Sequence, residues 1–199
     1  QQTVFKVKMT NAPYPVVSDT ATVFVHTIPT ATIVPPEPLK TCVGKSLLLT
    51  APIQAGVTYE WINGVLHENG NTYEFPGATQ DGLYNIVLNI KNQYCSSQKT
   101  LNINVYKNPT VAITPNNPSI CEGDLVTLNA ITSPVGTYDY AWTLGASSTV
   151  VNTTANFNFK QLTWGAYTAN VKVMDVNTGC EASTSDLIKV NKKPNYGLP

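Results

Sequence analysis

A cysteine, one further residue and a glycine open an apolar run twice in this chain. Residues 38–51 read PLKTCVGKSLLLTA, and residues 118–130 read PSICEGDLVTLNA. Self-similarity at a fixed spacing indicates that one structural unit is repeated. A period of roughly 80 residues is long enough for one small domain per unit. The repeat therefore constrains the fold more than any other feature of the sequence.

Four further matches keep the same order along the two units: PTATI with PTVAI, TYEWI with DYAWT, DGLYNIVLNI with WGAYTANVKV, and TLNINVYKNP with DLIKVNKKP. The stretch TVFKVKMTNAPYPVVSDTATVFVHTIP reads as the last two strands of a preceding unit, so we expect a segment of a longer protein. The predicted organisation is a partial repeat at 1–29, whole repeats at 30–109 and 110–194, and the start of a linker or next repeat at 195–199.

Each unit has the pattern of β-structure. Short runs such as SLLLTA, LYNIVLNI and TLNINV are rich in aliphatic and β-branched residues and are bounded by Gly, Pro, Asn or Asp, which is typical of strands joined by turns. No stretch keeps a helical period of apolar residues. Six or seven short strands per unit predict an all-β chain of tandem antiparallel sandwiches. The junctions contain proline, so we expect them to be stiff.

Charge and composition exclude several classes of function. Twelve lysines balance twelve acidic residues and give zero formal net charge. This balance argues against nucleic acid or an anionic membrane surface as the main partner, because both require clustered positive charge. No apolar run approaches the roughly 18 residues of a membrane span. The sequence holds no GxSxG, HExxH or P-loop pattern, so we predict neither catalysis nor a cofactor.

The cysteines are Cys42, Cys95, Cys121 and Cys180. Four cysteines allow three pairings, and spacing alone does not choose among them. A zinc site would need closely spaced ligands, and the chain has no CxxC pair and only two histidines. Disulfides are therefore expected, and they imply an oxidising compartment.

The order of cysteine, tryptophan, tyrosine and cysteine resembles the immunoglobulin-like fold. Trp61 and Trp142 lie where that fold buries the tryptophan of its strand C. Tyr84 and Tyr167 each follow a Gly-x pair, as does the tyrosine that begins strand F. The resemblance implies that these four side chains belong to the structural core.

The same resemblance implies one disulfide within each sandwich, although the cysteines have moved. An antibody domain has its second cysteine two residues after the tyrosine, where this chain has Ile86 and Ala169. Both cysteines of each unit lie near strand ends, and we expect the start of strand B to lie near the end of strand F. The implied pairs are Cys42–Cys95 and Cys121–Cys180, and a pair between repeats is the alternative.

A Cys-x-Gly turn before strand B, with a cysteine after strand F, resembles the immunoglobulin-like and PKD-like repeats of Bacteroidetes cell-surface proteins, including giant gliding-motility adhesins. The resemblance covers essentially the whole chain. It implies a secreted, extracellular protein that is exported by the type IX secretion machinery and held at the cell surface. The implied partners are neighbouring repeats of the same chain and a surface glycan or protein.

Three smaller signals each have two explanations. Thr20 lies in an Asp-Thr-Ala sequence that fits Bacteroidetes O-glycosylation, but such a tripeptide also occurs at ordinary strand edges. Asp175 begins a DVNTG stretch that could hold calcium, but Asp and Asn also favour hairpin turns. Trp164 could be an exposed platform for a sugar or could pack beneath a turn, and we expect packing.

The function that these observations favour is the stalk or adhesive body of a bacterial surface adhesin. Such a segment would extend from the cell, resist shear and proteolysis, and present a binding surface, with gliding motility as one setting. Two alternatives are a recognition module for a glycan or protein, and an accessory region of a secreted hydrolase.

Overall fold

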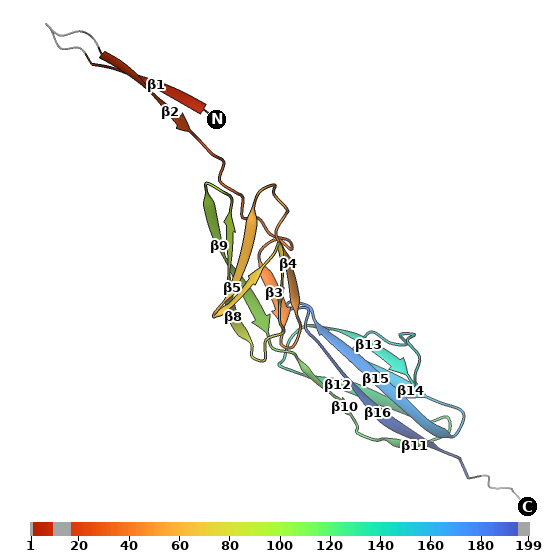
Figure 1. Ribbon diagram of the computed structural model, residues 1–199. Coiled ribbons are helices and arrows are strands. Elements are labelled where there is room, and N and C mark those ends of the chain that lie inside the picture. The colour runs from red at the N-terminus through yellow and green to blue at the C-terminus, as the bar shows by residue number, and fades with distance from the viewer. Residues whose placement is uncertain (1, 10–16, 195–199) are drawn as a thin grey trace, which may run out of the picture. The chain divides into compact units, whose positions relative to one another are not determined.

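The structure is a computed structural model that describes residues 2–9 and 17–194 (Figure 1). The described residues form strands and turns without a helix, so this part of the chain contains no helical segment able to cross a membrane. The all-β immunoglobulin-like fold predicted from the sequence is confirmed. At the N-terminal side, β1 (Gln2–Met9) and β2 (Val17–Phe24) form an antiparallel hairpin.

Seven strands follow between residues 39 and 106. They are β3 (Leu39–Cys42), β4 (Leu47–Thr50), β5 (Thr58–Asn63), β6 (Leu66–Asn69), β7 (Thr72–Phe75), β8 (Gly82–Lys91) and β9 (Ser96–Tyr106). One sheet has the order β3-β9-β8-β5-β6, and the other pairs β4 with β7. An isolated bridge between Val34 and Thr50 extends the smaller sheet.

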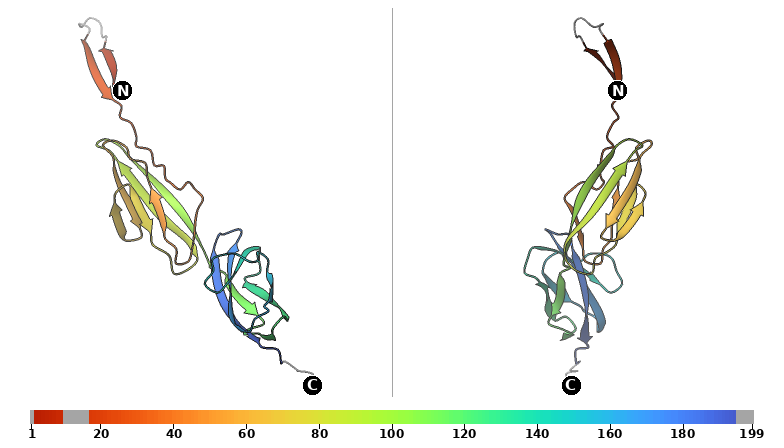
Figure 2. Two further views of the ribbon diagram at one scale, coloured as in Figure 1. Left: turned by 90° about the vertical axis from the view of Figure 1, so that its right-hand side faces the viewer. Right: turned by 60° about the vertical axis from the view of Figure 1, so that its left-hand side comes forward.

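Seven more strands lie between residues 110 and 191. They are β10 (Thr110–Thr114), β11 (Ser119–Cys121), β12 (Leu125–Ser133), β13 (Tyr138–Leu144), β14 (Asn156–Lys160), β15 (Gly165–Asp175) and β16 (Glu181–Asn191). The sheets have the orders β10-β12-β14 and β11-β16-β15-β13. Figure 2 shows the long hairpin of β15 and β16 in blue. The short strand β11 pairs with β16 in parallel.

Both sets of strands follow the immunoglobulin plan, in which strands B and E pair in one sheet while C, F and G pair in the other. In the first set, B and E are β4 and β7, and C, F and G are β5, β8 and β9. In the second set, B and E are β12 and β14, and C, F and G are β13, β15 and β16. Period-2 alternation directs one face of each strand inward. On β8, Ile86, Leu88 and Ile90 are buried, and the residues between them are more exposed.

A tryptophan lies at the centre of each core. Trp61 on β5 and Trp142 on β13 have no exposed surface. A buried indole N–H needs an acceptor, and each finds a backbone carbonyl at 2.9 Å, on Gly70 for Trp61 and on Thr154 for Trp142. Ile86 and Ala169, at the positions of the antibody cysteine, are fully buried in their own cores.

The chain divides into two compact units whose ranges interleave. The first comprises Gln1–Leu39, Leu47–Phe75 and Tyr84–Ile103, and the second comprises Lys40–Ser46, Pro76–Leu83 and Asn104–Pro199. The repeat boundaries expected from the sequence stay a prediction, and the linker expected at 195–199 lies outside the described residues.

Candidate functional site: the cysteine turns

The first cysteine ends β3 at a tight turn. Gly44 has φ of +78°, a left-handed conformation that glycine adopts without a steric penalty. The turn is held by two backbone hydrogen bonds of 2.9 Å, from the N–H of Gly44 to the carbonyl of Ala78 and from the N–H of Val43 to the carbonyl of Tyr106. Cys42 is therefore fixed beside the end of β9 and the segment that leads into β8.

The last cysteine ends the hairpin between β15 and β16. The Asp175 carboxylate oxygen Oδ1 accepts hydrogen bonds from the N–H groups of Asn177 at 2.8 Å and Thr178 at 3.2 Å, an Asx turn of the kind that aspartate favours. Cys180 is fully buried. Its Sγ lies 3.9 Å from the carbonyl oxygen of Tyr106, the same oxygen that accepts the hydrogen bond from the Cys42 turn.

These two cysteines form a disulfide with a Cα–Cα distance of 5.7 Å and a sequence separation of 138. Both belong to the second compact unit. Cys95 and Cys121 are free and half-buried. The pairs implied by the immunoglobulin resemblance, Cys42–Cys95 and Cys121–Cys180, are therefore wrong, and the bond joins the two sequence repeats instead.

The error lies in the assumed direction of the strands. The Cys42 turn bonds to Ala78, which precedes β8, so the start of strand B lies near the start of strand F. Cys95 follows the far end of β8, which is 10 residues long. At about 3.3 Å per residue this places the two cysteines roughly 30 Å apart, whereas a disulfide requires Cα atoms within about 7 Å.

Cys95 lies in surroundings that match those of Cys180. Asn92 Oδ1 accepts hydrogen bonds from the N–H groups of Tyr94 at 2.9 Å and Cys95 at 2.7 Å, another Asx turn. The Sγ of Cys95 lies 3.9 Å from the carbonyl oxygen of His26. Alignment of TATVFVHTIP with TLNINVYKNP places His26 at the position of Tyr106.

Cys121 lies in surroundings that match those of Cys42. The N–H of Gly123 donates to the carbonyl of Gln161 at 2.7 Å, and the N–H of Glu122 donates to the carbonyl of Asn191 at 2.9 Å. Gly123 has φ of +79°. This turn thus repeats the Cys42 turn, with the end of β16 in the place of the end of β9.

An ion pair adds charge to the Cys121 turn. The Asp124 carboxylate lies 3.1 Å from the ammonium of Lys193 and accepts a hydrogen bond from the N–H of Cys121 at 3.3 Å. The hydrogen bond from Lys193 is the largest cause that lowers the pKa of Asp124. Asp124 thus connects Lys193 to the backbone of the Cys121 turn.

The two tyrosines of the predicted corners lie at the starts of β8 and β15. The hydroxyl of Tyr167 is 3.1 Å from the carbonyl of Thr163, the return to the upstream backbone that defines a tyrosine corner. Its ring lies 5.5 Å from that of Phe159. Tyr84 packs edge-on against Phe75 at the same ring separation, 5.5 Å.

Trp164 does not pack beneath its turn, so that prediction is wrong. It is 66% exposed and borders an open groove of about 390 Å³ with Leu187 and Lys189. Its backbone N–H is held by Glu122 at 3.0 Å, which fixes the main chain while leaving the indole outside. Asp81, at the corresponding position of the first repeat, is also exposed.

Thr20 and Asp175 are the residues that the sequence suggested for glycosylation and for calcium binding. Thr20 is exposed on β2, opposite Lys6 of β1, and its glycosylation stays a prediction. Asp175 uses Oδ1 for its turn, as described above. Within residues 2–9 and 17–194, no group of three or more His, Cys, Asp or Glu side chains could hold a metal ion.

Asp186 is a buried residue that the sequence did not single out. It is 7% exposed on β16, and its carboxylate accepts hydrogen bonds from the N–H of Asn117, at 2.9 and 3.2 Å, and from its neighbour Leu187 at 2.9 Å. Asn117 has φ of +48°. Asp186 therefore holds the loop before β11. An acid at an inward position of an alternating strand is the signal that could have revealed it.

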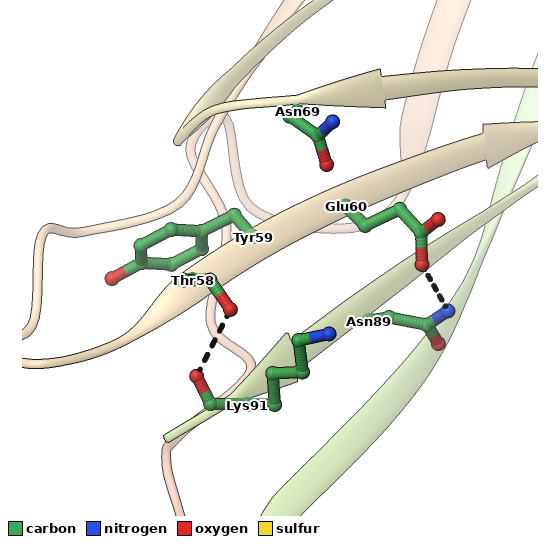
Figure 3. A pocket seen from close by; sticks show the side chains of 6 residues that line it. All are labelled: Thr58, Tyr59, Glu60, Asn69, Asn89 and Lys91. Atoms are coloured by element: carbon green, nitrogen blue, oxygen red, sulfur yellow. Dashed lines mark hydrogen bonds between the residues drawn. The ribbon is translucent and has the colours of Figure 1, made fainter. Parts of the chain in front are cut away.

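A polar pocket of about 260 Å³ lies on the β5 and β8 face of the first sandwich (Figure 3), lined by Thr58, Tyr59, Glu60, Asn69, Asn89 and Lys91. Glu60 is already paired, with His67 at 2.9 Å and with the Asn89 amide at 3.1 Å, and these contacts lower its pKa. Asn89 in turn accepts from Gln98 at 2.8 Å. The Glu60 carboxylate of this pocket is thus already held by His67 and Asn89.

Comparison with models of known protein families found no match, and comparison with curated proteins found none either. Among solved structures, the chain is similar to fibronectin(III)-like modules of Clostridium thermocellum CbhA, with a TM-score of 0.49, 16% identity, and coverage of 84% of this chain and 99% of that one. The PKD domain of human KIAA0319 has a TM-score of 0.38 and 22% identity, with coverage of 47% of this chain and 89% of that one.

Three N-terminal domains of the bacteriophage RB49 highly immunogenic outer capsid protein have a TM-score of 0.37 and 20% identity, with coverage of 75% of this chain and 55% of that one. Identities at this level concern the fold alone.

Proposed function

We propose that the chain is a non-catalytic structural and adhesive segment of a secreted bacterial cell-surface adhesin, of the Bacteroidetes kind that the type IX machinery exports. It works outside the cell, where disulfides persist. Its partners are neighbouring repeats of the same polypeptide and a glycan or protein at a surface, with gliding motility as one setting. The observation that carries the proposal is the Cys42–Cys180 disulfide.

That disulfide changes how the chain carries a pulling force. A load applied at the two ends reaches the bond from residues before Cys42 and after Cys180, and the residues between them lie outside the covalent path. The sequence separation is 138, so at 3.3–3.6 Å per residue the bond withholds roughly 450–500 Å of extended chain. A segment that resists extension in this way suits a stalk under shear.

Single-molecule pulling of the oxidised chain by its two ends tests this function. Full unfolding should lengthen the oxidised chain by roughly 450–500 Å less than the same chain after reduction. A Cys95→Ser/Cys121→Ser variant should behave as the unchanged chain does, because it keeps the disulfide. Equal extensions before and after reduction, with the bond verified by peptide mapping, would contradict the proposal.

Trp164 supports a second function, recognition of a glycan. An exposed aromatic ring beside an apolar groove offers a stacking face, with Lys189 at hand as a hydrogen-bond donor. On a glycan array, the unchanged chain should bind a subset of sugars, and Trp164→Ala should lose that binding. Tyr94→Ala is the control, because Tyr94 is also exposed, at 61%, and does not line this groove. Absence of all binding would leave the structural role alone.

A further inference from the structure

The two free cysteines have the same kinds of backbone hydrogen bonds and carbonyl contacts around them as the two bonded cysteines. In the hairpin before Cys95, the N–H of Asn92 donates to the Cys95 carbonyl at 2.9 Å, and in the hairpin before Cys180, the N–H of Asp175 donates to the Cys180 carbonyl, also at 2.9 Å. Each Sγ then lies 3.9 Å from a backbone carbonyl at the end of a preceding strand segment. Cys95 thus has the position of Cys180 in its own repeat.

The same correspondence holds at the other two cysteines. The N–H of Lys45 donates to the Cys42 carbonyl at 2.9 Å, and the N–H of Asp124 donates to the Cys121 carbonyl at 3.0 Å. In both turns the residue after the cysteine donates to the last residue of its repeat's final strand, at 2.9 Å. Cys121 thus has the position of Cys42, and the bonded pair combines the first position of one repeat with the second position of the next.

The division into units agrees with this arrangement. Lys40–Ser46, which carries Cys42, and Pro76–Leu83 belong to the second compact unit although they come from the first repeat. The Cys42 turn comes from the first repeat, but it therefore belongs to the same compact unit as the second repeat. In the second repeat the corresponding turn carries Cys121, and in the first repeat the hairpin that would receive such a turn carries Cys95.

We infer that Cys95 and Cys121 are the open halves of two further disulfides of the Cys42–Cys180 type. Cys121 bonds to the second cysteine of a following repeat, and Cys95 bonds to the first cysteine of a preceding one. The result is a series of disulfides between neighbouring repeats that carry both cysteines, whereas the partial repeat at 1–29 has no cysteine in its own hairpin to receive such a bond. The inference rests on the proposed function, because it requires an array of repeats in an oxidising compartment.

The partner repeat belongs to the same polypeptide rather than to a second copy. In the formed bond, the carbonyl of Tyr106 accepts the N–H of Val43 and lies against Cys180 Sγ. One residue thus ends the strand of one repeat and contacts the cysteine of the next. In a bond between Cys121 of one copy and Cys95 of another, the counterparts of Tyr106 are Asn191 in the first copy and His26 in the second. Both residues would have to occupy the position that Tyr106 alone takes in the formed bond.

The chemistry is an ordinary thiol–disulfide exchange. The two thiols lose two protons and two electrons and form one S–S bond, while a disulfide oxidant such as oxidised glutathione accepts them and becomes two thiols. In the test, a glutathione redox pair supplies this oxidant.

The experiment lengthens the chain by one repeat. Residues 1–194 are followed by a second copy of residues 110–199, because Pro194 corresponds to Pro109 in the repeat alignment. After refolding with the glutathione pair, free thiols are blocked and disulfide-linked peptides are mapped. The expected bonds are Cys42–Cys180 and Cys121 with the second copy's Cys180, with Cys95 and the second copy's Cys121 left as thiols.

A free Cys121 beside an intact Cys42–Cys180 bond would overturn the inference, as would Cys121 bonded to Cys180 of its own repeat or to Cys95 of another molecule. The unlengthened chain is the control, and its Cys121 should be labelled by a thiol reagent.

If the lengthened chain does not fold, disulfide mapping of the protein isolated unreduced from its own cells decides. Both cysteines should then be bonded within a single polypeptide, and free thiols or chains joined only through these bonds would refute the inference. The pulling experiment on the 199-residue chain needs only Cys42–Cys180, so the two proposals can fail separately.

Discussion

At the scale of single residues, Asp186 shows how a polar side chain can hold a loop in an apolar sandwich. Its carboxylate accepts hydrogen bonds from the backbone N–H groups of Asn117 and Leu187, and hydrogen bonds to a charged acceptor contribute more than neutral ones. Asp186→Ala leaves the N–H of Asn117 without this acceptor, so the free energy of unfolding should fall by about 1.5–3 kcal/mol. Urea denaturation measures the change. Asp186→Asn keeps an acceptor and should lose less, and equal losses in both variants would contradict this role.

The sequence predicted the buried tryptophans better than it predicted the disulfide pairs. The immunoglobulin resemblance implied that Trp61 and Trp142 belong to the core, and both have no exposed surface. Cysteine carries no such geometric information until the chain is folded, and four of them remain ambiguous. Trp164 was also misjudged, because a lone aromatic in a turn has no alternating neighbours to indicate its side.

At the scale of elements, the strands and the sandwich class could be predicted, but the end of the sandwich at which each strand starts could not. Alternation indicates which face of a strand is buried, and it is the same when the strand is reversed. Strand B of this chain starts beside the start of strand F, as the hydrogen bond between Gly44 and Ala78 shows. The direction of strand B relative to strand F decides whether the two cysteines of one repeat are close enough to bond to each other or must bond to a cysteine of another repeat.

The Cys42 turn depends on a close approach of two backbones at Gly77. A Cβ at this position would lie 2.5 Å from the carbonyl carbon and 2.7 Å from the carbonyl oxygen of Gly44. Gly77→Ala should therefore push the turn away from Ala78 and lower the free energy of unfolding by about 1–3 kcal/mol. It should also slow closure of the disulfide during oxidative refolding. Gly136→Ala is the control, because its Cβ would meet only the Tyr138 side chain, at 3.4 Å. Equal refolding and stability in the two variants would show that the approach at Gly77 is unimportant.

At the scale of the whole molecule, the disulfide closes a loop with a sequence separation of 138. In the chain-entropy account, a loop of this length constrains the unfolded state by about 5 kcal/mol, and measured values are commonly 2–4 kcal/mol. Cys42→Ser/Cys180→Ser should accordingly lower the free energy of unfolding by about 2–5 kcal/mol, as measured by denaturation without reductant. Cys95→Ser/Cys121→Ser should be nearly neutral, because neither thiol is bonded in this chain. The two pairs of substitutions remove equal numbers of sulfur atoms, so only the bond distinguishes them. If bonds within the repeats were the true ones, each pair of substitutions would break both and the two losses would be alike.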